Sequence, residues 1–279
     1  MIMTTRLQTH VFTSPSREFG RHGQTFSPTT ATLVTGERDA VLVDAQFIND
    51  EIANLGDMIE QTGKRLTSIY VTHAHADHYL GLGQLTERFP GAQAVTTAPV
   101  LAAIHKTVDD QMAQWRAMFG DAVPEPALLP SPLDGDTIDL DGQVLRVVEV
   151  GQGDIEPSTI VYIPSIDTVV AGDVAYNRVH LMLALSGPKE WDAWISSVDQ
   201  IERLGPEAVI AGHKAPDARD DDVATILDGT RDYIRAFRDA VAASGDAQEV
   251  VDTISAAYPD YGNLTTLLVS ARAAFRQRG

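Results

Sequence analysis

The chain has 279 residues, of which 44% are hydrophobic and 22% charged, a composition typical of a globular protein with a substantial core. Its net charge of -18 disfavours nucleic-acid backbones and anionic membrane surfaces, because both are bound through clustered Lys and Arg. Cysteine is absent, which excludes disulfides, thiolate nucleophiles and thiolate metal ligands, so any metal ion must be held by His, Asp or Glu.

Short β-branched runs alternate with longer amphipathic segments along most of the chain. Strands are predicted over residues 31–35, 40–45, 68–72, 92–96, 143–150, 158–164, 167–172 and 207–212. Helices are predicted over 49–61, 79–89, 99–119 and 188–204, and a long helical tail follows residue 216. Residues 121–136 form a proline-rich connector that we expect to lack regular structure. The order predicts an α/β core with a helical addition at its C-terminal end.

Residues 70–81, YVTHAHADHYLG, place three of the chain's eight histidines and one aspartate close together. His73 and His75 follow a predicted strand, and residues two apart in extended chain point the same way, so both can reach one metal ion. Asp77 and His78 lie where the chain turns into a helix, which makes a second metal ion nearby possible. A lone Asp there is usually a helix cap and a lone His usually a core residue, but the four together favour a metal site.

The spacing H-x-H-x-D-H resembles the signature of the metallo-β-lactamase superfamily, and the resemblance extends over about residues 7–216. Other parts of the family pattern are present, because VLVDA supplies Asp44, AGDVAY supplies Asp173 and VIAGHK supplies His213. The resemblance implies an α/β fold, the four-layer αβ/βα sandwich of that family. It divides the chain into a catalytic domain, residues 1–216, and a C-terminal helical extension packed on it, residues 217–279.

One segment departs from the family pattern. Where family members usually read G-H-T-x-G-S-T, residues 153–159 read GDIEPST, so Asp154 takes the position of the third histidine. Gln152 is the alternative ligand if the loop is shifted by two residues. We prefer Asp154, because Ser158 and Thr159 then fall in register and a carboxylate is a better ligand than a neutral amide. Without a metal, Asp154 would be an ordinary residue of a glycine-rich turn.

The resemblance implies a dinuclear metal centre. One ion would be held by His73, His75 and Asp154, the other by Asp77, His78 and His213, with Asp173 shared between them. Three carboxylates, where the family usually has two, leave less positive charge on two divalent ions and so weaken their Lewis acidity. The additional carboxylate also shifts the metal preference of the site from zinc towards manganese or iron, although zinc remains the expected metal.

The activity implied by the resemblance is metal-assisted hydrolysis, in which a hydroxide held by both ions attacks a carbonyl. Asp77 is expected to orient this nucleophile or take a proton, in addition to binding metal. Tyr176 and His180 come shortly after Asp173, beyond the end of a predicted strand, so they could stabilise an oxyanion or protonate a leaving group, or else only pack and hydrogen-bond. The alternatives to a hydrolase are a carboxylate-rich diiron redox protein and a non-catalytic metal-binding relative.

Two further helical segments contain large apolar side chains. Trp191 and Trp194 lie three residues apart, which favours packing in the core. Met112, Trp115, Met118 and Phe119 precede the connector, where the family often has a lid, so they could form an apolar wall for a substrate.

The acidic balance disfavours anionic substrates such as phosphodiesters, so we expect cleavage of an ester or lactone of a small, neutral to apolar molecule. No apolar stretch follows a basic region at the start of the sequence, which favours a cytoplasmic protein. The expected partner is a small-molecule substrate rather than nucleic acid or membrane, and the sequence does not indicate an oligomeric state.

Overall fold

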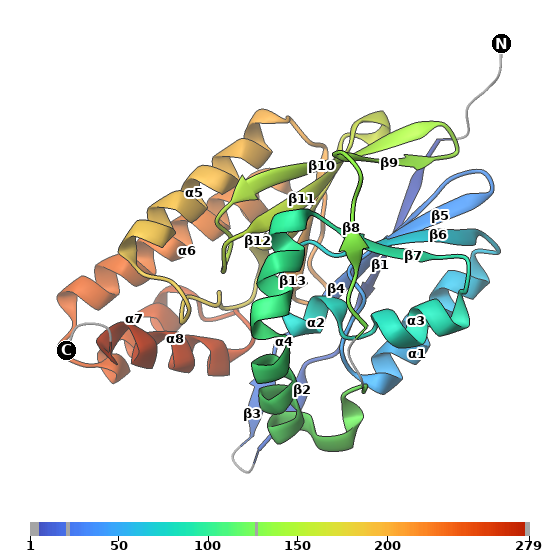
Figure 1. Cartoon of the computed structure of the whole chain (residues 1–279). Helices are drawn as coiled ribbons and strands as arrows, with labels where there is room; N and C mark the ends of the chain where they lie inside the picture. Colours follow the sequence, from blue (N-terminus) through green and yellow to red (C-terminus); the bar gives the residue numbers. More distant parts are fainter. Residues whose placement is uncertain (1–5, 21–22, 126–127, 277–279) are drawn as a thin grey trace.

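The computed structural model describes residues 6–20, 23–125 and 128–276 and forms two sheets packed face to face, with helices outside both (Figure 1). The first sheet has the strand order β1-β4-β5-β6-β7-β8. Its strands are β1 (Gln8–Thr13), β4 (Thr30–Thr35), β5 (Asp39–Val43), β6 (Arg65–Tyr70), β7 (Gln93–Thr96) and β8 (Ser131–Pro132). Its outer face is covered by α1 (Asn49–Gln61), α2 (Ala76–Tyr79), α3 (Leu82–Arg88) and α4 (Ala98–Phe119).

The second sheet has the strand order β13-β12-β11-β10-β9. Its strands are β9 (Thr137–Leu140), β10 (Gln143–Gly151), β11 (Ser158–Ile163), β12 (Thr168–Asn177) and β13 (Ala208–Lys214). The helices on its outer face are α5 (Pro188–Arg203), α6 (Val223–Ala243), α7 (Ala247–Ala257) and α8 (Leu264–Arg276). A separate hairpin, β2 (Arg17–Phe19) and β3 (Gln24–Phe26), lies beside α4 (Figure 1), and the short 3-10 helices η1 (Gly120–Ala122) and η2 (Pro164–Ile166) complete the elements.

Alternate residues of a single strand divide between two cores, as expected for a sheet covered on both faces. In β5, Val41 and Val43 pack in the core between the two sheets, whereas Ala40 and Leu42 pack with the helices outside. The strands β10, β11 and β12 divide in the same way between the inner core and the core under α5 and α6. The predicted four-layer αβ/βα sandwich is therefore confirmed.

The helical tail predicted after residue 216 forms the three helices α6, α7 and α8. Their apolar residues, among them Phe237, Ile254 and Leu267, share one core with β12 and α5. Trp191 and Trp194 of α5 lie in this core with at most 2% of their surface exposed, so their predicted packing role is confirmed. Among the described residues, no helix combines the length and apolar character that a membrane span requires.

Several predicted boundaries were wrong for identifiable reasons. The helix predicted over 79–89 is divided into α2 and α3, because the Gly81 N–H donates to the carbonyl of Gln46 instead of to a carbonyl of α2. The strand predicted over 167–172 continues as β12 to Asn177, with irregular pairing to β13 after Val170. Tyr176 therefore lies within a strand and not after its end.

The proline-rich connector was also predicted incorrectly in part. It contains the two-residue strand β8, which pairs with β7 at the edge of the first sheet. A proline is tolerated at a sheet edge, because no further strand needs its missing N–H. Residues 126 and 127 of the connector lie outside the described residues.

Candidate metal centre

The structure gathers the seven predicted ligand residues at one edge of the two sheets. The loop after β6 carries His73 and His75, and α2 at its end carries Asp77 and His78. Asp154 lies in the loop between β10 and β11, while Asp173 and His213 lie on β12 and β13. All except His75 are nearly completely buried, and they form two groups, each compact enough to hold one metal ion.

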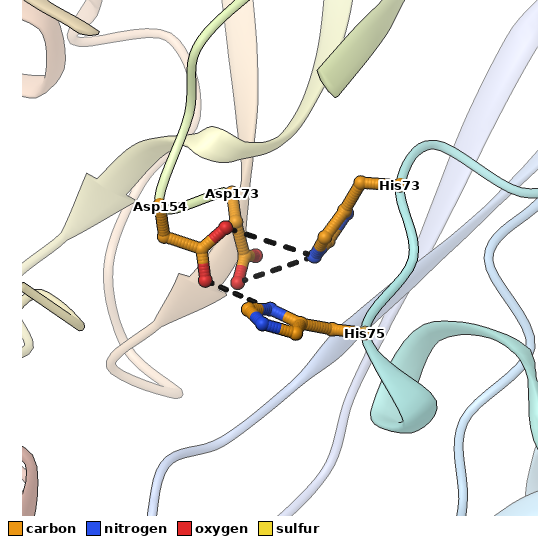
Figure 2. Close-up of side chains that lie close together, drawn as sticks. All are labelled: His73, His75, Asp154 and Asp173. Atoms are coloured by element: carbon orange, nitrogen blue, oxygen red, sulfur yellow. Dashed lines mark ion pairs between the residues drawn. The ribbon is translucent and has the colours of Figure 1, made fainter. Parts of the chain in front are cut away.

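The first group joins His73, His75, Asp154 and Asp173, whose side chains point towards one another in Figure 2. His75 Nδ1 lies 2.8 Å from Asp154 Oδ2, and His73 Nε2 lies 3.6 Å from Asp173 Oδ2. His73 Nε2 is also 4.0 Å from Asp154 Oδ1. Two imidazole nitrogens and two carboxylates thus converge from the two sheets.

The second group joins Asp77, His78 and His213. Asp77 Oδ2 lies 3.4 Å from His78 Nε2 and 3.3 Å from His213 Nε2. Asp173 stands between the two groups, because its Oδ1 is 3.3 Å from His78 Nε2 and its Oδ2 is 3.2 Å from His213 Nε2. A carboxylate in this position could be shared by two metal ions.

The two groups contain buried polar atoms that form no well-directed hydrogen bond with another described residue. These atoms are His73 Nε2, His78 Nε2, Asp173 Oδ1 and both carboxylate oxygens of Asp154. Buried polar groups are normally paired, so this concentration of polar atoms without a well-directed hydrogen bond fits a site that binds a cation. Imidazole nitrogens and carboxylate oxygens are ligands of divalent zinc, manganese and iron, so the residues present fit a dinuclear metal site.

The rings of His78 and His213 are fixed by hydrogen bonds on the side away from the two groups. His78 Nδ1 lies 2.8 Å from Asp44 Oδ2, and His213 Nδ1 donates to the carbonyl of Pro28 at 2.9 Å. Asp44 also accepts hydrogen bonds from the amide and hydroxyl of Thr72. Such contacts set which ring nitrogen carries the proton and leave Nε2 free to bind a metal.

The electrostatics of the site follow from burying several charged groups together. Burial raises the pKa of Asp154 to about 6, against the opposing effect of the adjacent His75. Burial alone would lower the pKa of His213, but the carboxylates of Asp173 and Asp77 raise that pKa to about 10. Without metal the site therefore retains protons at neutral pH, and a binding cation must displace them.

The structure of the loop before β11 shows which of the two candidates for the third ligand, Asp154 or Gln152, faces the centre. Asp154 lies in the first group, whereas Gln152 donates to the neighbouring carbonyl of Gly153 and belongs to neither group. Ser158 pairs with His73 in an isolated bridge, and Thr159 donates to the carbonyl of Thr72 at 2.7 Å. These contacts align the loop with the histidine motif and direct Asp154, not Gln152, to the centre.

The two further candidate residues occupy different positions. The Tyr176 hydroxyl donates to Asp173 Oδ2 at 3.0 Å, and its ring stacks on His213. Burial and the nearby Asp173 hold the pKa of Tyr176 well above its usual value, so it remains a donor. His180 lies in the cavity wall outside both groups, with Nδ1 2.9 Å from the Tyr233 hydroxyl, and burial lowers its pKa to about 4.

A cavity of about 580 Å³ leads to the centre. Its walls come from the hairpin, from α4 and from α8, and they are mostly apolar, with Phe26, Trp115, Met118 and Val269 among them. Of the apolar wall expected on α4, Trp115 and Met118 line the cavity, while Phe119 packs against Trp115. Among the described residues that line it, none is a lysine or an arginine.

Further residues, which the sequence pattern does not indicate, hold the candidate ligands in place through hydrogen bonds. Thr29 donates to Asp77 Oδ2 at 3.3 Å, and Gln46 donates in turn to the carbonyl of Thr29. Gln111 of α4 contacts the backbone of the histidine loop. These contacts connect residues far apart in the chain, so no local pattern could have indicated them.

Comparisons with known proteins agree with this geometry. The model of the metallo-beta-lactamase superfamily matches residues 24–213, more than half of the chain. No curated protein sequence matches the chain.

Solved structures show the same fold at low sequence identity. A metallo-beta-lactamase family protein from Thermus thermophilus is 19% identical, with a TM-score of 0.66 over 97% of this chain and 93% of that one. A metallo-beta-lactamase from Pontibacter korlensis is 18% identical, with a TM-score of 0.60 over 84% of this chain and 97% of that one. The metallo-beta-lactamase FIM-1 from Pseudomonas aeruginosa, in its mono-zinc form, is 15% identical, with a TM-score of 0.56 over 84% of this chain and 94% of that one. The matched family model, together with the two groups of His and Asp that meet at Asp173, shows that this chain belongs to the metallo-beta-lactamase superfamily.

Proposed function

We propose that the protein is a metal-dependent hydrolase that opens an ester, lactone or related acyl bond of a small, neutral to apolar molecule. The observation that carries this proposal is the position of the two ligand groups, which meet at Asp173 at the base of an apolar cavity. The cavity of about 580 Å³ is within the usual range for small-molecule sites, roughly 300–1,000 Å³.

The ligand groups would hold two divalent cations. His73, His75 and Asp154 would bind one, Asp77, His78 and His213 the other, with Asp173 shared. Bound there, the cations would supply an activated water and polarise an acyl carbonyl. We expect zinc, although the carboxylate of Asp154 also makes manganese and iron acceptable metals for the site.

The charges of the cavity support an uncharged substrate. A carboxylate or phosphate on the substrate would find no Lys or Arg among the described lining residues. It would instead meet the carboxylates of Asp110 and Glu156, which also line the cavity and are exposed. Like charges repel in such a site, so β-lactams with a free carboxylate and phosphodiesters are disfavoured.

Three residues would act on the substrate side of the centre. Asp77 lies between His78 and His213 and would orient the nucleophile in addition to binding metal. His180, neutral because burial lowers its pKa to about 4, would hydrogen-bond a leaving group from the cavity wall. Tyr176 would act mainly through Asp173, to which its hydroxyl donates.

The test is a hydrolysis panel of uncharged esters and lactones together with carboxylate-bearing β-lactams, run on metal-loaded and on chelator-treated protein. We expect turnover of the uncharged compounds that disappears with the chelator and with Asp173→Ala. Turnover that survives the chelator, or turnover of the anionic compounds alone, would refute the proposal. Iron with redox activity and no hydrolysis would favour the diiron alternative instead.

A further inference from the structure

The amide of Gln111 spans the two peptide groups on either side of His75. Its Oε1 accepts from the backbone N–H of Ala76 at 2.7 Å, and its Nε2 donates to the carbonyl of Ala74 at 2.7 Å. The same Nε2 also donates to Thr107 Oγ1 at 2.8 Å, one turn earlier on α4, which fixes the orientation of the amide. One side chain of α4 thus holds the loop at two points.

Both backbone groups depend on this partner. Ala74 and Ala76 are almost completely buried, so their polar groups cannot turn to solvent. Ala76 begins α2, and the first N–H groups of a helix have no partner within the helix. His75, at the cap position, makes no side-chain cap bond to α2. Gln111 therefore supplies the hydrogen bond that the start of α2 requires.

His75 differs from the other histidines of the centre in how its ring is oriented. The rings of His78 and His213 are held by Asp44 and by the carbonyl of Pro28 at the nitrogen that faces away from the centre. His75 instead directs Nδ1, the nitrogen nearer the backbone, at Asp154, and its side chain is 17% exposed. The direction of this ring therefore depends on the contact with Asp154 and on the backbone that carries it.

We propose that Gln111 is a positioning residue that holds His75 as a ligand of the first metal ion and thereby connects α4 to the metal centre. This inference rests on the proposed function, because it requires His75 to bind a metal ion. Outer partners that orient metal ligands commonly change metal affinity by about 10- to 100-fold when they are removed. Trp115, one turn further along α4, lines the same cavity, so the helix that forms part of the substrate wall also holds a ligand.

The experiment compares metal binding by Gln111→Met with binding by the wild type and by Gln114→Met. Methionine keeps the length and helix preference of glutamine and removes both backbone bonds. Gln114 is a matched control, because it lies on the same helix, lines the same cavity and forms no hydrogen bond to the loop among the described residues. The readouts are zinc affinity by chelator competition and the absorption spectrum of the cobalt-substituted protein.

We expect Gln111→Met to lower the affinity for one of the two bound ions by about 10-fold or more and to leave the affinity for the other within about twofold of the wild-type value. Gln114→Met should leave both affinities unchanged. In a His75→Ala background, Gln111→Met should have no further effect, because its target ligand is already absent. Gln111→Glu serves if the Met variant does not fold. Its side chain keeps the acceptor for Ala76 but cannot donate to Ala74 when ionised, so it should lower the affinity for the same ion.

Two results would overturn the inference while leaving the proposed function intact. Unchanged affinity for both ions would show that Gln111 does not position His75. An equal loss at both sites, with a lower melting temperature of the metal-free protein, would show a general structural role. A wild-type protein that binds no metal would overturn the proposed function and this inference together.

Discussion

Asp154 is the residue at which this chain departs most clearly from the pattern of its family. The structure places it 2.8 Å from His75, and both of its oxygens are buried without a well-directed hydrogen bond. An anionic ligand in place of a neutral imidazole lowers the charge of a metal-loaded centre by one. With metal bound, the same change would leave a coordinated water less acidic and the resulting nucleophile more basic.

Replacing Asp154 by Asn should therefore reduce metal affinity by about 10-fold or more, because a neutral amide oxygen substitutes poorly for a carboxylate. Gln152→Ala serves as the control, since Gln152 donates only to its neighbouring carbonyl, and its metal affinity should remain close to that of the wild type. Metal titration of both variants decides the matter. The reverse ranking would mean that the loop is shifted and that Gln152 is the ligand.

His180 makes the stability of the fold dependent on pH. Burial lowers its pKa to about 4 from the ordinary value of 6.5, so the unfolded chain binds a proton at a higher pH than the folded chain does. The stability that a neutral His180 allows is complete above about pH 6.5 and is lost as the pH falls towards 4, by up to about 3 kcal/mol. Denaturant unfolding of His180→Gln across this range should show a shallower loss of stability than the wild type. The exposed His105→Gln should follow the wild type, and parallel curves for all three proteins would rule out His180 as the source.

At the scale of elements, the division between α2 and α3 positions Asp77 and His78, the two candidate ligands that α2 carries. A Cβ atom on Gly81 would meet the backbone oxygen of Ala45. This neighbour cannot easily move, because Ala45 N–H donates to the carbonyl of His78 at 2.8 Å. A long helix starting at residue 79 would have no reason to stop at Gly81 by periodicity alone, and the sequence prediction accordingly missed the break.

Gly81→Ala should destabilise the fold by about 1–3 kcal/mol, the usual cost of inserting a methyl group into a filled space. It should also weaken metal binding, because the clash reaches the backbone bond of His78. Gly91→Ala is the matched control, since a side chain there would meet no atom within 4 Å, and its stability should stay near that of the wild type. Equal melting temperatures of the two variants would contradict this account.

The sequence predicted the elements whose pattern is local. The helix at 49–61 matches α1, and eight strands of the two sheets lie close to their predicted positions, whereas β1 and β9 were not predicted. The residues that gather at the candidate centre could also be foreseen, because each of them lies in a short local motif of the sequence. The hairpin β2-β3, the strand β8 and the contacts of Thr29 and Gln111 could not, because they depend on partners distant in the sequence.

At the scale of the whole molecule, the C-terminal helices and the sandwich share a core and a cavity. Phe237 and Leu267 pack with strands of the second sheet, and Val269 of α8 lines the cavity that leads to the candidate metal centre. Thr265 accepts a hydrogen bond from the backbone of Thr25 in the hairpin. The division of the chain at residue 216, which stays a prediction, therefore separates two parts that pack closely.

Removing the chain from residue 217 onward should leave a protein that does not fold cooperatively, because the outer face of the second sheet would lose the helices that bury it. We expect dye binding to exposed apolar surface and loss of a sharp thermal transition. A well-folded fragment of residues 1–216 that still binds metal would show that the extension is an independent addition.

The central claim is that this fold holds two metal ions through four histidines and three aspartates that meet at Asp173. Elemental analysis of the purified protein, with the melting temperature recorded before and after treatment with a chelator, tests it most directly. We predict close to two zinc, manganese or iron ions per chain and a lower melting temperature once they are removed, because buried carboxylates and imidazoles then lose their partners. One ion or none after loading with each of these metals, or a melting temperature that the chelator does not change, would contradict the account.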